Sequence, residues 1–230
     1  MIKKYEKLVG GLLTLLVCAC STDKAANTLF ERLSSEKTGI AFNNTIQIGG
    51  EINVIDFQYC YNGGGVGIGD FDQNGLPDIV FTGNQVPSKL YLNQGNLQFL
   101  DVTKTAGVTT DSWVTGVAIS DLNGDGMDDI YLNVGGADCQ DNCPNLLFIN
   151  KGKNENGIPL FEEEAEAYGL DDAGYSQQTV FFDYDKDGDL DAYIVRNGNV
   201  RFDKNAPLPQ KFFPAHLSDV LLENQSDIQI

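Results

Sequence analysis

The 230-residue sequence has little histidine, little basic charge and no long apolar run in its body. Its single histidine, His216, lies far from Cys60 along the chain, so Cys60 is interpreted as a buried thiol rather than a nucleophile. Only 15 basic residues face 33 acidic ones, and the net charge of −18 argues against nucleic acid or an anionic membrane surface as a partner. A hydrophobic content of 42% is normal for a globular protein, which argues against general disorder.

The main apolar stretch, LVGGLLTLLV at 8–17, is too short to cross a bilayer comfortably as a helix. Three lysines precede it and VCAC follows it, an arrangement that resembles a bacterial lipoprotein signal with Ala19 before the lipidated Cys20. The alternative is ordinary secretion with cleavage nearby. Lipidation of Cys20 would anchor the chain stably, so we expect an exported protein of the bacterial cell envelope, an outer-membrane lipoprotein.

Two further cysteines, Cys139 and Cys143, lie in the polar segment CQDNC. In an oxidising compartment they could close a small disulfide. The segment has no second cysteine pair and no nearby histidine, which argues against zinc.

Aspartate, in contrast, recurs in a fixed pattern. The chain contains DFDQNGLPD at 70–78, DLNGDGMDD at 121–129 and DYDKDGDLD at 183–191, called here the first, second and third loops. All three have an oxygen-bearing side chain at loop positions one, three, five and nine, and glycine at position six. Three copies of one pattern make chance a poor explanation.

Short apolar segments flank every loop and predict strands. Each loop lies between two of them and a third follows; the first two copies also have a fourth, at 97–103 and 160–164. The loops begin 51 and then 62 residues apart, a spacing typical of four-stranded β-propeller blades. A β-sandwich with three similar hairpins is the alternative. The predicted all-β organisation is a signal segment at 1–20, a tether and entry strand at 21–60, and repeats at 61–110, 111–172 and 173–230, the last one truncated.

The segment YNGGGVGIGDFDQNGLPDIVFTGNQVPSKLYLNQGNLQFLDVTKTAGV, 61–108, resembles a repeat of the FG-GAP/VCBS family, whose members are related to integrin α-chain blades. It is most similar to the cartilage-acidic-protein-like, ASPIC/UnbV-associated bacterial branch, and the resemblance covers about residues 40–224. Propellers of this family usually have about seven blades, whereas this chain supplies fewer than three. The resemblance therefore implies an incomplete propeller, the N-terminal part of something longer or a truncated product.

Carboxylates, amides and carbonyls are the ligands that calcium prefers, and a glycine permits the sharp turn that brings them together. An EF-hand is excluded because strands flank the loops and position twelve is Phe81, Leu132 or Ile194 rather than glutamate. Magnesium fits less well, because it resists dehydration. The resemblance implies about three calcium ions, with position-seven carbonyls (Leu76, Met127, Asp189) added to the side chains of Asp70, Asp72, Asn74, Asp78, Asp121, Asn123, Asp125, Asp129, Asp183, Asp185, Asp187 and Asp191. Bare acidic turns are the alternative, but carboxylates crowded without a cation would repel one another.

Repetition of the loops argues against an active site, and no catalytic residue or organic cofactor is predicted. We expect a calcium-stabilised, non-enzymatic module that binds a protein or glycan at the envelope, with self-association through uncovered blade faces also open. The alternatives are the scaffold of a polysaccharide-active surface enzyme and a non-functional fragment.

Overall fold

The computed structural model describes residues 28–49, 52–53, 57, 59–136, 143–196 and 218–225. Cys20, Cys139 and His216 lie outside these residues, so the predictions made for them stay predictions. The chain divides into two units at Ser34/Ser35, and the sheets described next belong to the second unit. No helix within the described ranges is long and apolar enough to span a membrane.

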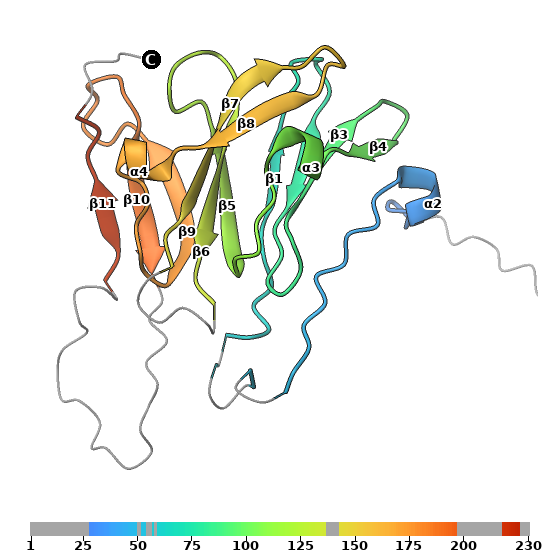
Figure 1. Cartoon of the computed structure of the whole chain (residues 1–230), viewed down its shortest axis with the longest axis horizontal. Coiled ribbons are helices and arrows are strands. Elements are labelled where there is room, and N and C mark those ends of the chain that lie inside the picture. The colour runs from blue at the N-terminus through green and yellow to red at the C-terminus, as the bar shows by residue number, and fades with distance from the viewer. Residues whose placement is uncertain are drawn as a thin grey trace, which may run out of the picture. The chain divides into compact units, whose positions relative to one another are not determined.

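Three antiparallel sheets make up the second unit (Figure 1). The first and second sheets have four strands in sequential order, and the third has three. The strands are β1 Val66–Gly69, β2 Asp78–Phe81, β3 Lys89–Asn93 and β4 Phe99–Asp101; β5 Val114–Ser120, β6 Asp129–Val134, β7 Leu146–Lys153 and β8 Pro159–Glu163; and β9 Ser176–Phe182, β10 Asp191–Arg196 and β11 Val220–Leu222. The prediction of all-β blades in an incomplete propeller is confirmed.

Within the described residues, three one-turn helices accompany the strands: α2 Ser35–Thr38, α3 Thr103–Ala106 and α4 Ala165–Tyr168. The first of the fourth strands, β4, is shorter than the predicted 97–103, because the chain turns into α3 at Thr103. The second, β8, has the predicted length but begins and ends one residue earlier, and α4 follows at Ala165. Each of these two helices ends at a glycine in the left-handed conformation, Gly107 or Gly169, where the backbone N–H returns to a helix carbonyl.

The sheets pack face to face, β1 against β5 and β5 against β9 (Figure 1). One apolar cluster, centred on Phe71, Leu90 and Ile130, fills the space between the first two sheets. A second, centred on Tyr131, Leu147 and Ala192, fills the space between the second and third. The second sheet is therefore buried on both faces, which explains why every residue of β6 is buried.

The segment before β1 contains α2 and an isolated bridge between Gly49 and Ile52. Phe42 stacks on Phe81 of the first sheet, with ring centroids 5.2 Å apart. Cys60 is fully buried and free, as predicted, in a small cluster with Phe57 and Trp113. Cys143 is disulfide-bonded, but Cys139 lies outside the described residues and the predicted pairing stays a prediction.

Candidate metal centres

Each aspartate loop closes the hairpin formed by the first two strands of its sheet. Position nine is the first residue of the second strand and pairs in register with the last residue of the first strand: Asp78 with Gly69, Asp129 with Ser120 and Asp191 with Phe182. The sheets thus hold the three loops in one shared geometry.

Side chains at positions one, three and five fold inward over the loop backbone. In the first loop, Asp70 accepts hydrogen bonds from the backbone N–H groups of Asn74 and Gly75, each at 2.9 Å. Asp72 accepts from the Asn74 N–H at 3.2 Å, and Asn74 accepts from the Leu76 N–H at 2.8 Å. The glycine at position six has a positive φ in every copy, which permits this sharp turn.

The other two loops repeat these contacts. Asp121 accepts from the Gly126 N–H at 2.7 Å and Asp183 from the Gly188 N–H at 3.2 Å. Position three accepts from the N–H of position five, and position five from the N–H of position seven, in both copies. The loops therefore hold their oxygen atoms inward through backbone hydrogen bonds of their own.

The aspartate at position nine joins the loop to the third strand of its sheet. Asp78 accepts from the N–H of Phe71 at 3.0 Å with one oxygen and from the N–H of Asn93 at 2.7 Å with the other. The same pair of bonds holds Asp129, through Leu122 and Asn150, and Asp191, through Tyr184 and Asn224. Position nine is thus a structural fastener as well as a predicted metal ligand.

Sequence reasoning missed the asparagine at the other end of this fastener. The side-chain amide of Asn93 donates to the carbonyl of Pro77, and that of Asn224 donates to the carbonyl of Leu190, both at loop position eight. Asn150 donates to Asp128 in the same way, at 3.4 Å, and to Phe71 of the first loop at 3.0 Å. The signal was present in the sequence, because asparagine ends all three segments LYLN, LLFIN and VLLEN.

Carboxylates converge in the first and third loops. Oxygens of Asp70, Asp72 and Asp78 lie within 4.8 Å of one another, as do those of Asp183, Asp185 and Asp187. In the second loop the amide of Asn123 takes position three, and it donates to Asp125 at 2.9 Å. Carboxylate and amide oxygens gathered in this way form an arrangement that suits calcium.

Two of the position-nine carboxylates, Asp78 and Asp129, are costly to ionise in their buried positions. Burial raises the pKa of Asp78 and of Asp129 to about 6, against the lowering effect of their backbone hydrogen bonds. Neighbouring aspartates raise the pKa of both groups further. Burial also raises the pKa of Asp72, and the charge of Asp70 adds to the effect. A bound cation would offset both the burial of these carboxylates and the repulsion between them, so the electrostatics favour ion binding.

The third loop contains a test of whether its residues fit a cation. Asp189, at position seven, is only 4% exposed, and its Oδ1 has no hydrogen-bond partner in the structure. Burial raises the pKa of Asp189, and the charge of Asp187 raises it again. A buried oxygen without a donor is costly, and a bound cation would satisfy it. The sequence predicted only the carbonyl of Asp189 as a ligand, so its side chain is an addition.

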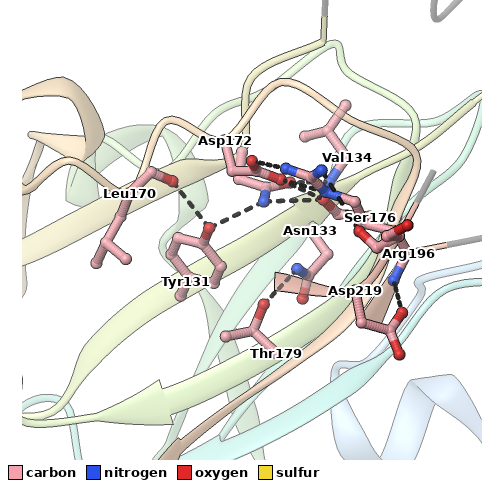
Figure 2. A network of polar contacts seen from close by, with 11 residues as sticks. Tyr131, Asn133, Val134, Leu170, Asp172, Ser176, Thr179, Arg196 and Asp219 are labelled. Atoms are coloured by element: carbon pink, nitrogen blue, oxygen red, sulfur yellow. Dashed lines mark hydrogen bonds and ion pairs between the residues drawn. The ribbon is translucent and has the colours of Figure 1, made fainter. Parts of the chain in front are cut away.

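A second polar cluster lies at the opposite ends of the strands, between the second and third sheets (Figure 2). Tyr131 donates to the carbonyl of Leu170 at 2.8 Å, and Asn133 donates to Thr179 at 2.7 Å. Asp172 forms an ion pair with Arg196, and the Arg196 Nε–H donates to the Asp172 Oδ2 at 2.9 Å. Tyr131, Asn133 and Thr179 are at most 1% exposed, so this network fastens the two sheets rather than forming an open site.

Comparisons with known proteins agree with the repeat architecture. Residues 70–132, which include the first and second loops, match the FG-GAP-like repeat family. A stretch of 136 residues is 31% identical to cartilage acidic protein 1 of Mus musculus and equally to that of Homo sapiens. The match covers 58% of this chain and 20% of each relative, so the chain spans about one fifth of their length. Residues 70–132 are therefore similar to FG-GAP-like repeats.

Proposed function

We propose that this protein is a calcium-binding, non-enzymatic FG-GAP repeat module. The observation that carries the proposal is the shared loop geometry, in which carboxylate oxygens converge within 4.8 Å of one another in the first and third loops. The buried Asp189 Oδ1, which has no hydrogen-bond partner, adds to it in the third loop. At millimolar calcium and a dissociation constant of about 0.1 mM, each ion would stabilise the fold by about 1.4 kcal/mol. Calcium would then fix the hairpins rather than take part in chemistry.

The decisive experiment follows thermal unfolding of residues 21–230 while calcium is titrated from a chelated baseline, with magnesium as the control ion. We expect the midpoint to rise with calcium and much less with magnesium. The double variant Asp183→Ala, Asp187→Ala should lose part of that rise. A matched variant, Asp111→Ala with Asp171→Ala, removes the same charge from two exposed positions outside the loops and should keep it. If calcium leaves the midpoint of a folded sample unchanged, the loops are bare acidic turns.

We further propose that the module is exported and held at the bacterial envelope by lipid on Cys20, where it binds a protein or glycan. The basic start, the short apolar run and the small residue before Cys20 support this. Metabolic labelling with a radioactive fatty acid tests it. Label should enter the chain and disappear in Cys20→Ser, whereas Cys18→Ser should retain it; a Cys20→Ser chain that is still labelled contradicts the assignment.

A further inference from the structure

The third sheet is incomplete on one side within the described residues. Its outer strand is β11, whereas the first and second sheets each add a fourth strand beyond the equivalent strand. A cavity of about 400 Å³ opens beside β11, between the second and third sheets. Its walls are mainly apolar and include Leu122, Leu170, Phe181, Ala192 and Leu222.

The equivalent space between the first and second sheets is filled by β8. Phe161 of β8 packs against Phe71 with ring centroids 5.9 Å apart, and Phe71 holds loop position two as Leu122 does in the next copy. Phe161 pairs in register with Asn150, and Phe99 of β4 pairs in the same way with Asn93. The cavity is therefore the place where a fourth strand of the third sheet would insert its aromatic side chain opposite Asn224.

A turn that recurs after each one-turn helix also indicates where the fourth strand of the third sheet would lie. Gly39, Gly107 and Gly169 each follow a one-turn helix and have φ of 78°, 85° and 67°. A Cβ on Gly107 would lie 3.0 Å from the carbonyl oxygen of Phe161, and a Cβ on Gly39 would collide with that of Phe99. A Cβ on Gly169 would meet nothing within 4 Å. Two of the three turns thus pack on a fourth strand, and the third faces open space.

Backbone hydrogen bonds indicate how an added strand would attach. Val102, the residue after β4, donates its backbone N–H to the carbonyl of Leu90 at 3.0 Å. Glu164, the residue after β8, donates in the same way to the carbonyl of Leu147 at 2.8 Å. The equivalent residue of β11 is Leu221. An extended segment could extend the sheet here by strand addition, with one large apolar side chain for specificity.

The chain itself contains a segment with the required pattern. Residues 29–40 read LFERLSSEKTGI, close to LFEEEAEAYGL at 160–170, and both run from an aromatic residue through a helical turn to glycine and an aliphatic residue. Phe30 precedes its glycine by nine residues, one more than Phe99 and Phe161 do. Leu29 and Phe30 are 92% and 86% exposed, which is unusual for side chains of this size.

We propose that residues 28–34 of a second copy of this chain form the fourth strand of the third sheet, with Phe30 in the cavity. The fourth strand of the first sheet is followed by the turn at Gly107, which packs on the second sheet, so this exchange would also place copies head to tail. That arrangement covers two apolar faces at once: Tyr193 and Leu221 of the third sheet with Tyr184 of the third loop, and Val66 and Ile68 of the first sheet, all at least 37% exposed. The proposal does not depend on calcium binding.

Light scattering of residues 21–230 at increasing concentration, in calcium and in chelator, tests it. We expect reversible self-association, weakened about tenfold or more by Phe30→Ala, because an aromatic anchor carries much of such an interface. Gly169→Asn should also block association, since asparagine tolerates the left-handed conformation and its side chain would occupy the space of the added strand. Gly157→Asn is the matched control: Gly157 has φ of 76° and open space, but lies in the β7–β8 turn.

A peptide of residues 28–40, labelled with a fluorophore, gives a second readout through anisotropy. It should bind the Phe30→Ala chain and dissociate the assembly of the unchanged chain, while a Phe30→Ala peptide should do neither. A folded chain that stays monomeric at about 100 μM and does not bind the peptide overturns the proposal, as does association that Phe30→Ala and Gly169→Asn leave unchanged. Association with another protein, in place of a second copy, would likewise overturn it.

Discussion

The first and third aspartate loops have the same backbone geometry but very different surroundings. Hydrogen bonds join the first loop to the second sheet and its loop. Gln73 donates to the carbonyl of Gly126 in the second loop at 2.9 Å, and the Lys153 ammonium of β7 donates to the carbonyl of Asp72. The third loop has no such contact with another sheet among the described residues. Its Asp183, Asp185 and Asp187 are all exposed.

The two loops also differ in charge. The first has carboxylates at positions one, three and nine, whereas the third has them at positions one, three, five, seven and nine. Burial raises the pKa of the Asp72 carboxyl, and the nearby charge of Lys153 lowers it by a smaller amount. Hydrogen bonds to neighbouring elements therefore support the first loop, and we expect the third loop to depend more on a bound cation.

The largest expected effect concerns position nine, which both loops share. Asp78→Ala would leave the buried N–H group of Phe71 and the part-buried N–H group of Asn93 without an acceptor, and should lower the free energy of unfolding by about 3 kcal/mol. Asp191→Ala should cost less, because Tyr184 is 42% exposed and water can replace the lost bond. Urea unfolding in chelator measures both. Asp171→Ala, an exposed position, is the control, and equal losses from Asp78→Ala and Asp191→Ala would contradict the comparison.

Hydrogen exchange should separate the loops next. Removal of calcium is expected to speed exchange about tenfold or more at the N–H groups of residues 183–191, where charge is highest and support lowest. Residues 70–78 should change less. Mass spectrometry of peptides from both loops gives the ratio of the exchange rates with and without chelator for each loop. A greater change in the first loop would show that burial, rather than charge, sets the dependence on the ion.

The pH dependence of the chelated chain should come next in size. The folded pKa of Asp78 and of Asp129 is about 6, above the value of 3.8 for an unfolded chain, so the folded state binds more protons between these values. Stability from these groups is therefore fully present below about pH 4 and is lost as the pH rises through 6. Lowering the pH from 7 to 5 should raise the chelated melting temperature by several degrees, on the order of 5 °C.

Calcium should reverse that trend, because protons compete with the ion for the same oxygens. Asp129→Asn, which cannot titrate, should show a shallower pH slope in chelator than the unchanged chain. A chelated melting temperature that falls between pH 7 and 5 would show that other groups dominate.

The fold was largely predictable because the signals are local and repeated. Apolar strands on both sides of each DxDxDG-like loop define the hairpins, and Asp78, Asp129 and Asp191 mark their register. The roles of Asn93, Asn150 and Asn224 needed coordinates, since the bonds that they make join residues 15 to 33 positions apart. The similarity of TGI at 38–40 to AGV at 106–108 and YGL at 168–170 is also visible in the sequence, but its meaning depends on which strand each glycine contacts.

The smallest expected effect tests the support that the first loop receives from its neighbour. Lys153→Met would keep the apolar part of the side chain but remove the donor to the Asp72 carbonyl, and should lower stability by about 0.5 to 1 kcal/mol. Lys151→Met is the matched control, because Lys151 lies on β7 as Lys153 does and forms a half-exposed ion pair with Glu164. Its loss of stability should be smaller. Hydrogen exchange should then show faster opening at 70–78 after Lys153→Met alone, with 183–191 unchanged. If both loops opened equally, the first loop would not owe its order to this contact, and the contrast between the two loops would rest on charge alone.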